Sequence, residues 1–175
     1  MLDGKIHVLG GGNDVSTLAD HSVYDPSADR WSAAAPLPRA KGSPAAAVLG
    51  GRIYAIGGRS GGTDFGDVDF YDAASNRWSR GPRIGARGTA GAVVYRGAIH
   101  VFGGESQVGG RTLRAVLRLG RLGWQPVRAM PTARSFARAV VFRDAVYVVG
   151  GSRFYGAGHS SPGTNVVERF FVPRR

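Results

Sequence analysis

Four short apolar runs, each ending in two glycines, recur along the chain every 46 or 47 residues. They occupy residues 6–11, 53–58, 99–104 and 146–151. Each run is too short for a globular helix and is rich in β-branched and aromatic residues, which indicates a buried strand. The glycines favour a sharp turn or a close backbone contact at the end of each strand. They are Gly10, Gly11, Gly57, Gly58, Gly103, Gly104, Gly150 and Gly151.

Other strand patterns follow the same period. A strand of small residues precedes three of the double-glycine strands, at 45–49, 90–95 and 137–142, and a tight turn joins each pair. A third strand follows at 22–24, 68–71, 113–119 and 165–172. A fourth strand carries Trp31, Trp78 or Trp124. One unit is therefore predicted to contain four short strands, and no segment has the sustained 3.6-residue period of a helix.

This arrangement resembles the kelch repeat. The matching features are the double glycine after an apolar strand, a Tyr-Asp pair at 24–25 and 71–72, a Trp six or seven residues later, and a period near 50. The resemblance implies an all-β fold in which each repeat forms one four-stranded blade of a β-propeller, with essentially no helix. Stacking of blades hides the apolar faces that a single small sheet would expose.

The number of repeats departs from the family pattern of six or seven blades. We expect a single repeat domain over 1–175, with partial blades at 1–42 and 135–175 and complete blades at 43–88 and 89–134. This is about three and a half blades, an open or partial ring. The chain is then a fragment of a longer protein, a truncated reading frame or a half-ring that self-associates, because exposed blade faces favour association.

Charge is distributed unevenly along the chain. The net charge is +11, yet residues 1–72 carry a net charge of −3 and residues 73–175 carry +14. A basic half could attract nucleic acid, anionic lipid or an acidic partner. The arginines are scattered singly, without a dense stripe of interleaved aromatic residues, so nucleic-acid binding is disfavoured and a solvated arginine-rich surface is the alternative.

Composition excludes several classes of site. The chain has no Cys, which excludes disulfides, thiolate metal sites and cysteine nucleophiles but leaves the compartment open. No apolar stretch approaches the ~20 residues of a membrane span. The start of the chain lacks the basic segment and apolar run of a secretory signal.

The histidines and tryptophans have structural interpretations. His7 and His100 fall at the repeat position of Tyr54 and Tyr147, which predicts a shared structural role. His21 and His159 lie in or beside loops, without carboxylates at ligand spacing, so no metal site is predicted. The period of Trp31, Trp78 and Trp124 favours packing between blades, with the indole N–H groups bonded to backbone, over a stacking platform.

Candidate binding residues lie in loops that topology places on one face of the blades. Arg59, Arg111 and Arg153 follow no strict repeat position and are predicted ligand contacts, with Phe154 and Tyr155 as an apolar anchor. Guanidinium groups there would suit carboxylate or phosphate. Arg87 and Arg134 recur at the same repeat position as Arg39. They either contact the ligand together with these arginines or cap each blade. Arg83, Lys41 and Arg128 lie in the same connections, and Glu105 lies in the loop of the third repeat.

The predicted function is a kelch-type interaction module for a protein, an acidic small molecule or a carbohydrate, without cofactor or metal. The alternative is part of a carbohydrate-active enzyme that resembles the sialic acid mutarotases. Glu105, Asp64 and His159 are then the candidate bases, none with an evident partner in the sequence. The copper chemistry of galactose oxidase, another kelch-type propeller, needs a cross-linked Cys, so its absence excludes that activity.

Overall fold

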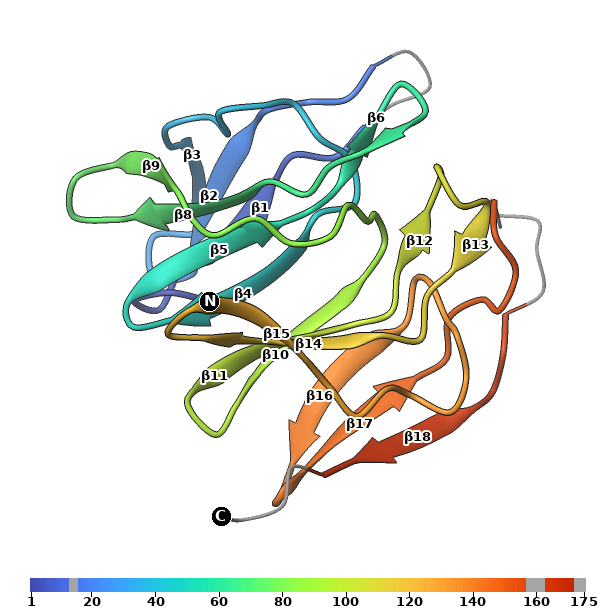
Figure 1. Ribbon diagram of the computed structural model, residues 1–175. Coiled ribbons are helices and arrows are strands. Elements are labelled where there is room, and N and C mark those ends of the chain that lie inside the picture. The colour runs from blue at the N-terminus through green and yellow to red at the C-terminus, as the bar shows by residue number, and fades with distance from the viewer. Residues whose placement is uncertain (13–15, 157–162, 172–175) are drawn as a thin grey trace.

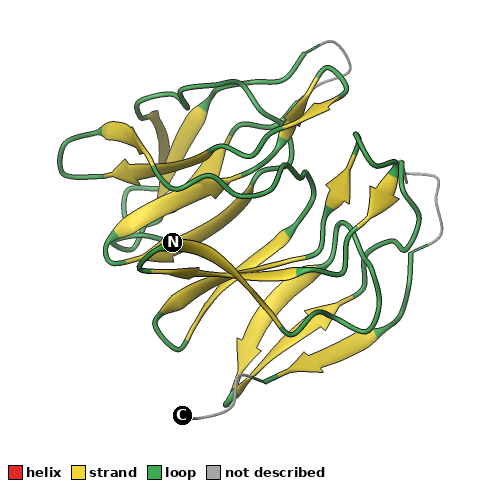
Figure 2. Cartoon of the chain, viewed as in Figure 1, coloured by secondary structure: helices red, strands yellow, loops and turns green. Residues whose placement is uncertain are grey.

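The chain forms an all-β structure. The computed structural model describes residues 1–12, 16–156 and 163–171. These residues contain eighteen strands and no helix, which confirms the predicted fold class (Figure 2). Accordingly, none of the described residues belongs to a helix that could cross a membrane.

Fourteen of these strands form four antiparallel sheets that follow one another in chain order (Figure 1). The first sheet contains β1 (Ile6–Leu9), β2 (His21–Asp25) and β3 (Arg30–Ala33). The second contains β4 (Ala45–Leu49), β5 (Arg52–Ile56), β8 (Val68–Asp72) and β9 (Arg77–Arg80). The third contains β10 (Gly91–Tyr95), β11 (Ala98–Phe102), β14 (Val116–Gly120) and β15 (Gly123–Val127). The fourth contains β16 (Arg138–Phe142), β17 (Ala145–Val149) and β18 (Val167–Phe170).

The core lies between successive sheets. Ile56 and Val68 of the second sheet pack in one cluster with Ile99 and Val101 of the third. A second cluster joins the third sheet to the fourth in the same way. Each sheet thus buries the apolar side chains of its inner strands against its neighbour, as the repeat pattern predicts.

Each of the first three double glycines lies at the end of a strand, where its backbone contacts the segment that connects its own sheet to the next one. The N–H groups of Gly58 and Gly104 donate to the carbonyl oxygens of Arg87 and Arg134, at 2.9 and 2.8 Å. Gly103 has a φ of +59°, and a Cβ built there would overlap the Arg134 carbonyl oxygen. A side chain is therefore excluded at this position by both backbone conformation and space.

Two tryptophans connect neighbouring sheets through the predicted backbone hydrogen bonds. The indole Nε1 of Trp78 donates to the carbonyl oxygen of Ala35 in the preceding connection, at 2.8 Å. Trp124 makes the equivalent bond to Pro82, also at 2.8 Å. The expectation for Trp31 is wrong: its side chain is 58% exposed and lies against Tyr24 of its own sheet. No sheet precedes the first one within the described residues, so nothing covers this indole.

The third strands of the third and fourth sheets start later than predicted, at Val116 and Val167. The N–H of Leu113 donates to the Gly104 carbonyl, and the N–H of Gly103 donates to the Ala115 carbonyl. Residues 113–115 therefore bond to the double glycine at the end of the loop. They do not extend the pairing between β11 and β14.

Two small ribbons that were not predicted project from the loops after the double glycines. One consists of β6 (Arg59–Ser60) and β7 (Thr63–Asp64). The other consists of β12 (Glu105–Ser106) and β13 (Arg111–Thr112). β6, β12 and β13, which contain the candidate residues Arg59, Glu105 and Arg111, lie on the same side of the molecule (Figure 1).

Candidate functional site

A buried basic residue occupies each connection between sheets. Lys41, Arg87 and Arg134 each accept, through the backbone carbonyl, a hydrogen bond from the second glycine of a double-glycine strand. All three side chains are buried. Arg39, which the spacing groups with Arg87 and Arg134, does not hold this position. Lys41 does, because it is Lys41 that the backbone places against Gly11.

The charged groups at this position bind partners within the protein. The ammonium group of Lys41 donates to Asp69 Oδ2 at 3.0 Å. Arg134 lies 2.6 Å from Glu168 Oε2 and also donates to three backbone carbonyls. Within the described part of the chain Arg87 donates to the carbonyls of Gly85 and Gly103 and has no carboxylate partner, and burial lowers its pKa to about 10. This geometry favours the blade-capping interpretation for Arg87 and Arg134.

Arg59 connects the two small ribbons. Its Nη2 donates to Glu105 Oε2 at 2.6 Å, and its Nε lies 3.7 Å from Asp64 Oδ1. The side chains of Asp64 and Glu105 are each only 1% exposed. Two of the three candidate bases therefore converge on one arginine, and that arginine is tied into an ion-paired link between neighbouring sheets. His159 lies outside the described residues.

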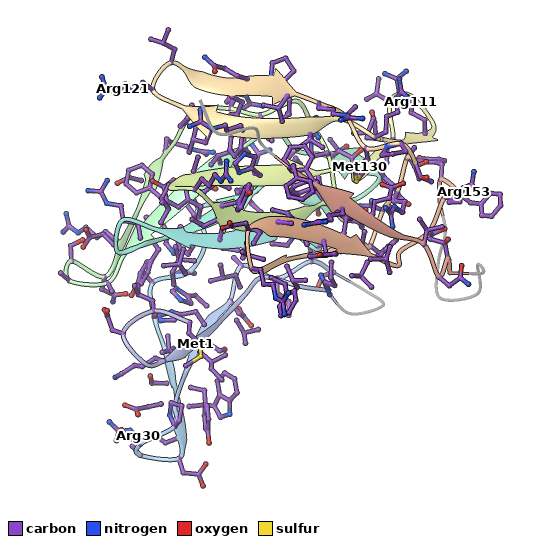
Figure 3. All side chains as sticks on the ribbon, turned by 90° about the horizontal axis from the view of Figure 1, so that it is seen from below. Met1, Arg30, Arg111, Arg121, Met130 and Arg153 are labelled. Atoms are coloured by element: carbon purple, nitrogen blue, oxygen red, sulfur yellow. The ribbon has the colours of Figure 1, made fainter. Side chains whose placement is uncertain are left out.

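Arg111 and Arg153 remain exposed, and they lie at the same end of the molecule (Figure 3). The hydroxyl of Thr112, next to Arg111, donates to the carbonyl oxygen of Arg153 at 2.9 Å, which joins the third and fourth loops. A cavity of about 540 Å³, here called the loop pocket, opens beside them. Its described lining consists of Arg153, Phe154, Gly163 and Thr164.

The apolar part of this surface is exposed as well. Phe154 and Tyr155 are both solvent-exposed, and Phe154 contributes to the lining of the loop pocket. The Ser152 hydroxyl accepts a hydrogen bond from the backbone N–H of Phe154 at 3.2 Å, which shapes the start of this loop. Cationic and aromatic side chains therefore lie side by side where the sequence predicts a ligand contact and an apolar anchor.

Three arginines converge beside the second sheet. The sequence places Arg39 and Arg83 in the connections of the candidate binding face, whereas Arg80 was not predicted. Arg39, Arg80 and Arg83 all approach the buried carboxylate of Asp67. Arg80 was missed because it lies at the end of a strand and not in a loop. Arg80 lies two residues after Trp78, and the equivalent positions of the first and third sheets hold Ala33 and Pro126. An arginine that does not repeat at this position is the sequence signal that could have identified it.

A histidine pair was also missed. His7 Nδ1 lies 2.8 Å from His21 Nε2, and His21 Nδ1 lies 3.2 Å from the Ala35 carbonyl oxygen. Burial lowers the pKa of both imidazoles. Among the described residues there is no group of three or more side chains of the types that hold a metal ion.

Comparison with protein-family models gives a match to the KLHDC2/KLHL20/DRC7 Kelch-repeats domain over residues 1–151. This match covers most of the chain. The chain belongs to the kelch-repeat family. The four sheets are therefore kelch blades, the first and last with three strands each in the described structure. The resemblance seen in the sequence is thus confirmed.

Solved structures show the same kelch-type fold. Among 158 matching chains, the structure of YjhT aligns with a TM-score of 0.82 at 14% sequence identity. The alignment covers 98% of this chain and 64% of YjhT. A likeness at this identity concerns the fold alone. A search of curated protein sequences found no significant match.

Proposed function

We propose that this kelch chain is a protein-interaction module that binds an acidic segment of a partner protein at the loop pocket. The observation that carries the proposal is the lining of one cavity by Arg153 and Phe154, with Arg111 on the adjoining ribbon. The volume of about 540 Å³ lies in the range of cavities that hold a ligand or an anchoring side chain.

The chemistry of these side chains determines the class of partner. Guanidinium groups form paired hydrogen bonds with carboxylates, and Arg111 and Arg153 have no carboxylate partner among the described interactions. An aromatic ring beside them provides apolar area that fixes the position of a peptide. An acidic peptide with one apolar side chain therefore matches both halves of the surface. Membership of a family of interaction modules supports this assignment by analogy.

The enzymatic alternative has one supporting observation. Asp64 and Glu105 lie next to Arg59, so carboxylates and a guanidinium group coexist as a mutarotase-like site would require. Both carboxylates are almost completely buried, however, and already engaged by Arg59. We therefore favour binding. NMR of sialic acid anomers incubated with the protein tests this choice, and we expect exchange no faster than in buffer.

The binding proposal is tested with peptides selected on the protein from a phage-displayed random library. Their affinities are measured by fluorescence anisotropy with the wild type and with R153A, F154A and R121A. Arg121 is the matched control because it is exposed and lies far from Arg111 and Arg153 (Figure 3). We expect acidic peptides, with binding about tenfold weaker for R153A and F154A and unchanged for R121A. Selection of no acidic peptide, or equal losses in all three variants, would contradict the proposal.

A further inference from the structure

The arginines between the first two blades form a second, separate site. Nη1 of Arg39 lies 3.3 Å from Asp67 Oδ2, and Nη1 of Arg80 lies 3.5 Å from the same oxygen. Nη1 of Arg83 donates to Asp67 Oδ1. We call these three side chains the arginine rim. They are 47%, 57% and 72% exposed, whereas the Asp67 side chain is 1% exposed.

The fold does not require this cluster. The carbonyl oxygen of Asp67 accepts a hydrogen bond from the N–H of Gly57, the first glycine of the preceding double-glycine pair. This hydrogen bond identifies the equivalent position in the other blades. Ala115 and Val166 hold the same position in the third and fourth blades. Those two blades keep the same backbone without an acid there. Asp20 holds the position in the first blade, but it is exposed and has no arginine partner among the described ion pairs. The arginines gathered on a buried acid are therefore specific to this boundary within the described structure.

The buried ion pair at this boundary is reached by one member of the arginine rim, since Nη1 of Arg80 lies 3.3 Å from Asp69 Oδ1. Lys41 pairs with Asp69 at 3.0 Å, with both side chains fully buried. Arg134 and Glu168 form the equivalent pair two boundaries further along, and no arginine rim surrounds them in the described structure. One ion pair without surrounding arginines therefore suffices to hold a connection against the next blade, and the fold does not need all three exposed arginines for this contact.

The charges of the cluster are unbalanced. Four cationic groups, those of Lys41 and the arginine rim, surround only the two carboxylates of Asp67 and Asp69. Burial alone would raise the pKa of Asp67, but Arg39, Arg83 and Arg80 outweigh it and hold that pKa below its ordinary value. Asp67 is thus a fixed anion that draws three guanidinium groups together and leaves an excess of two positive charges at the surface.

We propose that the arginine rim binds a phosphomonoester group. Such a group carries a charge of about −1.5 to −2 at neutral pH, which matches the excess. Its oxygens accept the paired hydrogen bonds that guanidinium groups offer, and each arginine contacts Asp67 through Nη1 alone, which leaves its other N–H groups for the ligand. The Arg39 guanidinium also lies 4.6 Å from the centre of the Phe65 ring, which restrains its orientation.

This site shares no residue with the loop pocket, so failure of one proposal leaves the other intact. The experiment is isothermal titration calorimetry of the full chain with two probes, inorganic phosphate and a short phosphoserine peptide, with the unphosphorylated peptide as a blank. The variants are R80Q and R83Q, with R77Q on the same strand as the control. The thermal unfolding midpoint of each variant is measured to show that the variant keeps its fold.

We expect saturable binding of the phosphoserine peptide that is about tenfold weaker in R80Q and R83Q and unchanged in R77Q. Binding must also strengthen from pH 5 to pH 7.5, because the second phosphate ionisation, near pH 6, supplies the dianion. Binding of both probes identifies the phosphoryl group itself as the ligand, and binding of the peptide alone identifies a phosphopeptide. Absence of saturable binding by the wild type, or equal losses in R83Q and R77Q, would overturn the proposal.

Discussion

At the scale of single residues, the position filled by Lys41, Arg87 and Arg134 shows how a repeat uses one cationic side chain. The backbone at this position meets the second glycine of a strand, and the side chain extends into the boundary with the next blade. Where that blade offers Asp69 or Glu168, an ion pair forms. Leu117 holds the corresponding position of the third blade, so Arg87 must bond to carbonyl groups instead.

The pair of Lys41 and Asp69 should contribute strongly to stability as a unit. In D69N the ammonium group loses its carboxylate inside a fully buried environment. We expect the free energy of unfolding to fall by about 3–5 kcal/mol, measured by urea denaturation. The control is R52Q, which breaks an exposed pair with Asp72 at 3.9 Å and should cost below about 1 kcal/mol. A loss for D69N no larger than that for R52Q would contradict this account.

The double glycine should be more sensitive to substitution than a turn glycine. Gly103 and Gly97 both have positive φ, at +59° and +69°, but only a Cβ at Gly103 would overlap backbone atoms. We expect G97A to cost about 1 kcal/mol from backbone strain and G103A to cost at least about 3 kcal/mol. Urea denaturation of the two variants measures the difference. Equal costs would show that space plays no part.

The His7 and His21 pair predicts a pH dependence of stability. Burial lowers both pKa values below 6.5, so the unfolded chain binds more protons than the folded chain just below that pH. The thermal midpoint should therefore fall as the pH drops from 7.5 to 5.5. The double variant H7Q/H21Q should have a smaller pH dependence in the same scan, while His100 remains in both proteins. An unchanged dependence would contradict the assignment.

At the scale of elements, the strands could be predicted because apolar alternation and glycine position repeat from blade to blade. The ribbons β6–β7 and β12–β13 could not, because their strands contain only two residues each and no alternation. The basic position was assigned to Arg39 and not to Lys41 because spacing alone cannot decide which residue of a variable connection meets the glycine. Loop lengths differ between blades, and only the hydrogen bonds settle the register.

The tryptophans provide a test of contact between elements. W78F removes an indole N–H that donates to the Ala35 carbonyl across a blade boundary, and we expect a loss of about 2 kcal/mol in urea denaturation. W31F changes an exposed side chain and should cost below about 0.5 kcal/mol. Acrylamide should also quench a fluorescence component that disappears in W31F. Equal stability losses would contradict the observed difference in packing.

At the scale of the whole molecule, successive blades follow an arc, with the loop ribbons on one side (Figure 1). The first and last blades expose positions that the inner blades bury. Val149 and Val167 are exposed, whereas Phe102 and Val116, at the same positions of the third blade, are almost completely buried. We expect such faces to favour contact with a further blade, from this chain or another.

The sequence predicted part of the candidate site. Arg111, Arg153, Phe154 and Tyr155 were predicted because they break the repeat in long loops, and the structure places them on one exposed surface. Arg59 and Glu105 break the repeat too, but they bond to each other across a blade boundary, which no spacing within one repeat reveals. Arg39 and Arg83 were predicted to lie on the loop face, but their convergence with Arg80 on Asp67 was not, because it depends on contacts between different segments of the chain.

We expect an acidic partner to bind where the third and fourth loops meet. Hydrogen–deuterium exchange of the chain with and without the selected acidic peptide tests it most directly. We predict protection of amides at 111–113 and 152–156, with no change in β1–β3 or around Arg121. Protection confined to the first two blades, or no protection at saturating peptide, would contradict the account.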